Sequence, residues 1–239
     1  DPMVRTRREQ AAGGPLTAPD RAMDLPSLFA LAWPVLLKGT GYTLLFAVAS
    51  MIFGLPLAGL VTLIRVLQVW GLSSLVAVYV SVIRGTPLLV QIFIVYYGLP
   101  SAGIELSPVT AGILTLTLNV AAYMSETLRG SINAVTQGQW MAGTSLGLTR
   151  DQTLRYVVGP QALRAAVPSL SNSLISLIKD TSLVSVIAVT ELMLATKELI
   201  ATTFQPFPLY LGAAAIYWML SLSFEQIQKW MEKRVAYPH

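Results

Sequence analysis

Three apolar stretches of the chain carry polar side chains at helical spacing, which places each set on one helix face. The sets are Ser81, Arg84, Leu88 and Gln91; Thr115, Asn119, Ala122 and Glu126, with Tyr123 beside them; and Ser169, Ser173, Ser176 and Asp180, with Asn172 adjacent. A charged side chain at the centre of a bilayer costs about 2.5–3.5 kcal/mol on insertion scales, so it faces the bundle interior and usually marks function. The three faces predict a polar pathway formed by Arg84, Gln91, Asn119, Tyr123, Glu126, Ser173, Ser176 and Asp180.

Each polar set also has a purely structural interpretation. Glu126 lies three residues before Arg129, which is the spacing of a local ion pair. Arg84 has a side chain long enough to reach a membrane interface. The serines allow close helix packing, and Lys179 and Asp180 could pair at a helix end. The convergence of three polar faces favours the pathway over these four separate interpretations.

The composition excludes several kinds of catalytic chemistry. The chain has no cysteine, which rules out disulfides, thiolate nucleophiles and cysteine metal sites. Its one histidine is the terminal His239, so we expect neither a Ser–His pair nor a metal site. The phosphate-binding loop Gly-x-x-x-x-Gly-Lys-Ser/Thr is absent, so uphill transport would draw on an ion gradient or a separate ATPase. Because the chain has no nucleotide-binding motif, we do not expect it to be an enzyme itself. The net charge is only +4, so we expect no nucleic-acid partner.

The polar faces lie in a chain that is too apolar for a water-soluble fold. Of its 239 residues, 54% are hydrophobic and 12% are charged, whereas a typical soluble domain is about 25% charged. Five apolar stretches are predicted to span a membrane: residues 40–67, 72–99, 109–128, 153–189 and 207–224. All should be helices, because open strands leave backbone groups unsatisfied in lipid, and prolines such as Pro87 and Pro160 should kink them. The predicted fold class is an all-α membrane protein with about five transmembrane helices.

The predicted organisation is a polar leader over 1–25, an amphipathic interfacial segment over 26–39, a transmembrane domain over 40–232 and a tail over 233–239. Lysine and arginine are more frequent on the side that holds residues 130–152. By the positive-inside rule, that segment is a cytoplasmic loop, the N-terminus is outside and the C-terminus is inside.

The segment between the third and fourth spans, GSINAVTQGQWMAGTSLG (130–147), is longer than the usual helix–helix connection of about 2–8 residues. Gly138 begins and Gly147 ends a run that should form two helical turns, with Trp140, Met141 and Thr144 on one face and Gly143 with Gly147 on another. A short surface helix here suits the docking of a cytoplasmic partner. A structural interfacial helix is the alternative.

Four motifs follow one another in the middle of the chain: RGTPLLVQ (84–91), TLNVAAYMSE (117–126), QALR followed by a proline four residues later (161–168), and IKDTSLVSV (178–186). In this order they resemble the permeases of polar amino-acid ABC transporters. The resemblance covers most of residues 72–192 and implies the fold of a type I importer permease.

The resemblance also assigns a role to the cytoplasmic loop. In the family, Glu-Ala-Ala with a glycine four residues after the last alanine forms a coupling helix that enters a cleft of the ATPase. That motif falls here on Met141, Ala142, Gly143 and Gly147, so methionine replaces the glutamate and glycine the second alanine. The coupling residues implied are Gln139, Trp140, Met141, Ala142, Gly143 and Gly147.

The function implied by the resemblance is translocation of polar or charged amino acids across a bacterial cytoplasmic (inner) membrane by alternating access. The implied partners are two ATP-binding-cassette subunits that bind ATP and Mg, a second permease (this chain or a homologue), and an extracytoplasmic amino-acid-binding protein. Lipid surrounds the chain, and no cofactor is expected in the chain itself. Arg84 is the candidate partner of the cargo carboxylate, and Glu126 or Asp180 that of its ammonium group or cationic side chain.

Two alternatives belong to other classes. An ion-coupled secondary carrier commonly shows inverted repeats, and none is found in these five spans. An intramembrane aspartyl-type hydrolase would use two of Glu126, Asp180 and Glu191, yet no motif frames these carboxylates as a pair.

Overall fold

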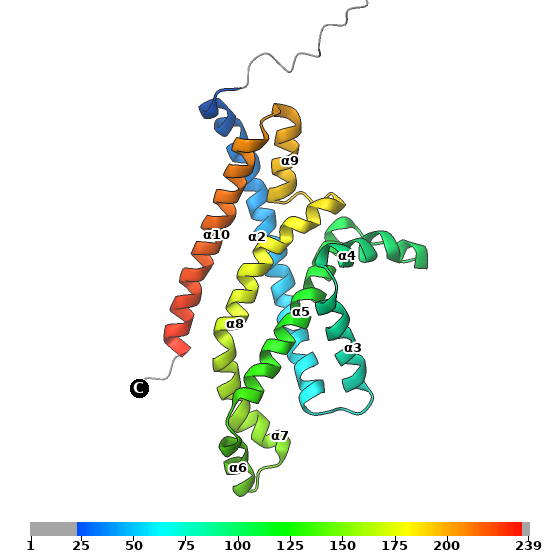
Figure 1. Ribbon diagram of the computed structural model, residues 1–239, viewed down its shortest axis with the longest axis vertical. Coiled ribbons are helices and arrows are strands. Elements are labelled where there is room, and N and C mark those ends of the chain that lie inside the picture. The colour runs from blue at the N-terminus through cyan, green and yellow to red at the C-terminus, as the bar shows by residue number, and fades with distance from the viewer. Residues whose placement is uncertain (1–22, 236–239) are drawn as a thin grey trace, which may run out of the picture.

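Helices and the turns between them make up residues 23–235, the part of the chain that the computed structural model describes (Figure 1). The predicted leader therefore lies almost wholly outside the described residues. In chain order the elements are α2 (Leu25–Val66), α3 (Leu72–Gly85), α4 (Leu88–Phe93), the π-helix η1 (Ile94–Gly98), the 3₁₀-helix η2 (Leu99–Ala102), α5 (Pro108–Ala134), α6 (Gln137–Ser145), α7 (Arg150–Thr153), the π-helix η3 (Leu154–Val158), α8 (Gly159–Asp180), the 3₁₀-helix η4 (Thr181–Ile187), α9 (Leu192–Thr203) and α10 (Pro206–Val235).

Helix α2 includes the segment predicted to be interfacial. It runs for 42 residues without interruption, so residues 26–39 are continuous with the first predicted span. Pro34 and Pro56 lie inside it, as membrane helices tolerate when neighbouring groups satisfy the freed backbone. Asp24 caps its start by accepting a hydrogen bond from the Ser27 amide at 3.4 Å.

The second predicted span is broken at Pro87, the proline at which the sequence predicts a kink. Helix α3 and the helical segment over 88–102 meet at an angle of 111°. Thr86 is extended (φ −121°, ψ 148°), because the ring of the following proline disfavours helical backbone at the preceding residue. The kink expected at Pro87 therefore redirects the chain, and α4 projects sideways from the bundle (Figure 1).

The fourth predicted span is a continuous helical run through α7, η3, α8 and η4. The π-helix η3 ends two residues before Pro160, and Pro168 lies within α8. Helix α9 lies between the fourth and fifth predicted spans, where no helix is predicted from the sequence. Helix α10 continues to Val235, three residues beyond the predicted boundary of the tail.

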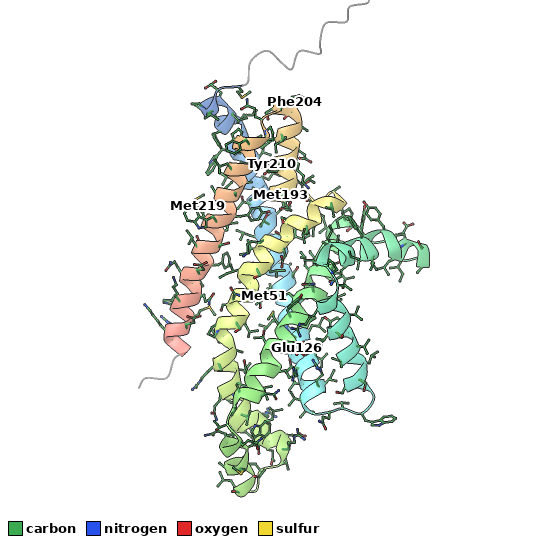
Figure 2. The ribbon with its side chains drawn as sticks, in the orientation of Figure 1. Met51, Glu126, Met193, Phe204, Tyr210 and Met219 are labelled. Carbon is green, nitrogen blue, oxygen red and sulfur yellow. The ribbon has the colours of Figure 1, made fainter. Side chains whose placement is uncertain are left out.

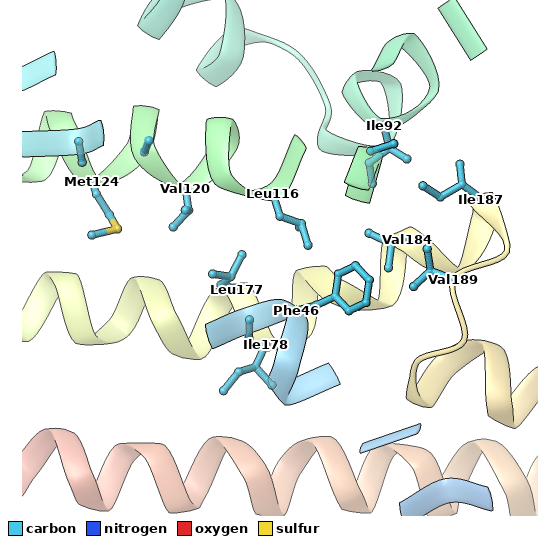
Figure 3. Packing of buried hydrophobic residues seen from close by; sticks show 14 of the residues in the cluster. Phe46, Ile92, Leu116, Val120, Met124, Leu177, Ile178, Val184, Ile187 and Val189 are labelled. Atoms are coloured by element: carbon cyan, nitrogen blue, oxygen red, sulfur yellow. The ribbon is translucent and has the colours of Figure 1, made fainter. Parts of the chain in front are cut away.

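The core lies where α2, α5 and α8 meet (Figure 3). Leu116 of α5 faces Leu177 of α8, and Met124 of α5, Ile178 of α8 and Phe46 of α2 belong to the same cluster. Ile92 of α4 packs onto Val184 and Ile187 of η4, which fixes the base of the projecting arm. This packing holds the polar faces of α5 and α8 beside each other.

Three described helices are long and apolar enough to cross a membrane: α2, α5 and α10. The bent pair over 72–102 counts as a fourth if it is one span, and α8, with 22 residues, is the remaining predicted span. The first described residues lie at one end of the long axis. The C-terminal end of α10 and helix α6 lie toward the other end (Figure 1). The lysine and arginine distribution predicts that the end with α6 faces the cytoplasm.

Candidate functional site

A groove of about 970 Å³ runs between α5 and α8 and is closed on one side by the end of α3. Its lining combines the three predicted polar faces: Arg84, Thr86, Pro87, Leu88, Asn119, Val120, Tyr123, Glu126, Thr127, Pro168, Ser169, Asn172, Ser173, Ser176, Leu177 and Asp180. Every predicted pathway residue lines it except Gln91. From Pro168 to Asp180 the α8 wall rises roughly 18 Å at 1.5 Å per residue. The serines of α8 therefore face an open groove instead of a packed helix.

One end of the groove is built around Glu126. Its carboxylate pairs with Arg65 of α2, with Arg129 one helical turn away at 2.7 Å, and more distantly with Arg84 of α3 at 3.6 Å. Arginines from three helices thus surround one carboxylate. Glu126 is labelled in Figure 2. The local pair with Arg129 predicted from spacing is present, together with a contact to Arg65 that no local pattern indicated.

Arg84 is the least engaged of these arginines. Its side chain is 44% exposed, and it donates no hydrogen bond to any described residue. The guanidinium lies 5.5 Å from the centre of the Tyr123 ring, a cation–π contact that orients it along the groove wall. Its donors are therefore available to an anionic ligand inside the groove.

The opposite end of the groove carries Asp180, because α5 and α8 run in opposite directions (Figure 1). Asp180 is half-buried and accepts no hydrogen bond from a described residue. Glu126 and Asp180 are the acidic side chains among the groove's lining. Since Glu126 is already held by arginines, Asp180 is the better placed of the two to accept an ammonium group.

Gln91 stabilises the bend beside the groove. Pro87 has no amide hydrogen to donate to the Ile83 carbonyl, which a helical residue at that position would pair. The Gln91 amide nitrogen donates to that carbonyl at 2.8 Å and to the Thr86 carbonyl at 3.1 Å. Its oxygen accepts from Asn119 of α5 at 3.0 Å. Gln91 is thus buried beneath the lining and tied to it through Asn119.

Glu191 lies outside the groove, in a closed environment. It is fully buried at the start of α9, where it accepts from the Met193 and Leu194 amides at 2.9 Å each. The Tyr217 hydroxyl donates to it at 2.8 Å and the Thr43 hydroxyl at 3.5 Å. The carboxylate joins α2, α9 and α10, and it does not line the groove that contains the other two carboxylates of the hydrolase alternative. No group of three metal-ligating side chains occurs among residues 23–235.

The predicted surface helix is α6, at the end of the molecule beside α7 (Figure 1). Met141 is 61% exposed on its outer side, and Gly143 is buried against Thr153. A Cβ atom at Gly143 would lie 2.5 Å from the Thr153 Cγ2 atom, so the side chain of Thr153 takes the space that an alanine would need. Gly147 adopts φ +79° just after the helix, a left-handed conformation that glycine adopts without strain. The helix ends at Ser145, so Gly147 does not share a helix face with Gly143.

Residues 54–237 match the family described as "binding-protein-dependent transport system inner membrane component". The chain is 44% identical over 204 residues to the L-cystine transport system permease protein TcyB of Bacillus subtilis, covering 85% of this chain and 87% of that protein. It is 36% identical over 206 residues to the glutamine transport system permease protein GlnP of Escherichia coli K12, covering 85% and 94%.

A solved structure has the same architecture. A chain from a structure titled "Crystal structure of an amino acid ABC transporter with histidines" superposes with a TM-score of 0.85 at 32% sequence identity. The match covers 90% of this chain and all of that one. The bent second span and the unpredicted helix α9 thus occur within a known architecture.

Proposed function

The chain belongs to the family of binding-protein-dependent transport system inner membrane components, and from this premise we propose that its groove passes polar amino acids across a bacterial inner membrane. The chain is the permease subunit of an ABC amino-acid importer. The family favours this function over an ion-coupled carrier. The relatives named for L-cystine and for glutamine support a polar amino acid as cargo.

One observation carries the proposal: residues predicted from three separate helices line a single polar groove in an otherwise apolar molecule. Lipid-facing surfaces contain few such groups, since each costs free energy in hydrocarbon. A groove of about 970 Å³ also has the size of a small-molecule site, which is typically about 300–1,000 Å³.

The ends of the groove suit the two charged groups of an amino acid. The arginine-rich end offers the free donors of Arg84 to a carboxylate. The Asp180 end offers a carboxylate to an ammonium group or to a cationic side chain. Glu126 was the other candidate for the ammonium group, and its contacts with Arg65 and Arg129 make that role less favourable.

Energy would come from partner subunits, because the chain has no phosphate-binding loop. We propose that two ATP-binding-cassette ATPases bind ATP and Mg and dock on α6, and that a second permease closes the open side of the groove. An extracytoplasmic binding protein would deliver the amino acid. ATP binding would draw the coupling helices together and open the groove outward, and hydrolysis would reset it.

Uptake by proteoliposomes tests the function. The complex purified with its ATPases is reconstituted with binding protein outside and ATP inside, and uptake of radiolabelled L-cystine, L-glutamine, L-arginine and L-histidine is measured. We expect ATP-dependent uptake of at least one, and none with an ion gradient alone. Uptake driven by the gradient without ATP would contradict the importer mechanism.

Cross-linking tests the coupling site. Because the chain has no cysteine, Met141→Cys introduces a single thiol on the exposed side of α6. We expect it to cross-link to the ATPase subunit in the intact complex. Trp70→Cys is the control, since Trp70 is 97% exposed in the turn between α2 and α3, a different surface element at the same end of the molecule (Figure 1). Cross-linking of Trp70→Cys alone would place the docking site elsewhere.

A further inference from the structure

Glu126 and the cargo compete for the same arginine. We propose that Glu126 is a positioning residue that holds Arg84 while the groove is empty and yields it to the carboxylate of the incoming amino acid. This inference rests on the proposed function, and it adds an exchange of partners to the groove's binding site. The juxtaposition that carries it is one glutamate shared by three arginines, of which only Arg84 lines the groove.

The contacts of Glu126 are unequal in a way that permits exchange. Arg129 donates to both carboxylate oxygens, from Nη2 at 2.7 Å and from Nε at 3.3 Å. Arg65 also donates directly, from α2. The Arg84 nitrogen is 3.6 Å away, beyond a hydrogen bond. Glu126 therefore loses little when Arg84 turns to another anion.

Arg84 is placed to make that exchange. Its side chain is more exposed than that of Glu126, 44% against 16%. The contact with the Tyr123 ring uses none of the guanidinium's hydrogen-bond donors, and Arg84 lines the groove. A cargo carboxylate can accept two parallel hydrogen bonds from the guanidinium, a geometry that the pair with Glu126 does not reach.

Arg65 and Arg129 set the strength of the competitor. While Arg65 and Arg129 both pair with the Glu126 carboxylate, they weaken its attraction for Arg84. Removing Arg129 would leave Glu126 with one fewer cation and draw it toward Arg84. The inference thus makes predictions of opposite sign: loss of Glu126 tightens cargo binding, and loss of Arg129 weakens it.

The test measures binding and transport separately on the complete permease–ATPase complex. Equilibrium binding, without binding protein, uses whichever of radiolabelled L-cystine, L-glutamine, L-arginine and L-histidine the wild-type complex transports. Glu126→Gln should lower the dissociation constant about two- to fivefold, the range of a partly exposed ion pair, and slow transport because cargo leaves less readily. Arg129→Gln should raise the dissociation constant by a similar factor. Glu126→Asp, one methylene shorter, should shift binding in the same direction as Glu126→Gln.

Two controls separate this role from a purely structural one. Glu198→Gln makes the same chemical change at an exposed position of α9 and should leave binding unchanged. In an Arg84→Gln background, Glu126→Gln should no longer tighten binding, because the effect acts through Arg84. Tightening that persists there would assign the effect to net charge and overturn the inference.

The remaining outcomes decide between the inference and the proposed function. Absence of ATP-driven uptake by the wild-type complex contradicts the proposed function itself. Uptake without measurable binding by the wild-type complex, or with equal dissociation constants in all variants, overturns only the inference. If Glu126→Gln does not assemble, Glu126→Asp and Arg129→Gln still provide the two opposite signs.

Discussion

Glu126 and Glu191 are two glutamates in contrasting environments. Glu126 is partly exposed, and its partners are cations on the wall of an open groove. Glu191 is fully buried, and its partners are two backbone amides and two hydroxyls of other helices. Fixed neutral donors tie Glu191 into the fold, whereas Glu126 retains one loose, exchangeable contact. We infer that the partners of a carboxylate in a membrane bundle separate a structural role from a functional one.

The largest expected effect is the loss of stability on removing Glu191, the glutamate in the closed environment. Glu191→Ala removes the carboxylate to which the part-buried Tyr217 hydroxyl donates and removes the cap of α9. We expect the free energy of unfolding to fall by about 2–4 kcal/mol, measured by denaturant titration in detergent with tryptophan fluorescence. Glu198→Ala, exposed on the same helix, is the control and should change it by less than about 0.5 kcal/mol. Equal stability of the two variants would remove the distinction between the sites.

A buried glycine extends the comparison to packing. Gly143→Ala would force its Cβ onto Thr153, and overpacking of this kind costs about 1–3 kcal/mol. We expect lower stability and weaker coupling between ATP hydrolysis and uptake, both restored by adding Thr153→Ala. Gly138→Ala is the matched control, because the nearest atom to its Cβ would lie 4.0 Å away. Failure of Thr153→Ala to compensate would mean that the contact does not explain the glycine.

Substitutions in the groove should show the reverse pattern: uptake should change, whereas the free energy of unfolding should not. Arg84→Gln removes the free donors from the groove, and we expect uptake at low cargo concentration to fall about tenfold, equivalent to about 1.4 kcal/mol. The free energy of unfolding should remain near that of the wild type. Arg155→Gln, at an exposed arginine outside the groove, should leave uptake unchanged. A loss of stability equal to that of Glu191→Ala would show that Arg84 is structural.

The smallest change sharpens the contrast. Tyr217→Phe removes one of the donors to Glu191, and a hydrogen bond of this kind contributes about 0.5–1.5 kcal/mol. We expect a loss of stability in that range with uptake unchanged, measured by the same titration and uptake assays. Tyr210→Phe, on an exposed part of the same helix, is the control. Lost uptake at full stability would connect Glu191 to transport after all.

The sequence patterns predicted which residues share a helix face more accurately than they predicted how the backbone bends. The periodicity of polar residues placed Asn119, Tyr123 and Glu126 on one face of a helix, and the structure puts that face on the groove. The same reasoning assigned residues 72–99 to one helix, although Thr86–Pro87 turns the chain by 111°. A proline signals a break, but the angle depends on what the two halves pack against. Here Ile92 packs on η4, and Gln91 bonds across the bend to α5.

Composition and local spacing determined the class of this protein: an apolar helical chain, its polar faces, a short surface helix, and motifs that resemble amino-acid permeases. These properties depend on residues within a few turns of one another, so the sequence displays them directly. Only the tertiary structure decided which carboxylate is closed and which is open. Arg65 is 61 residues from Glu126, and Thr43 is 148 from Glu191. Such partners meet only when distant helices pack, and no local periodicity records that meeting.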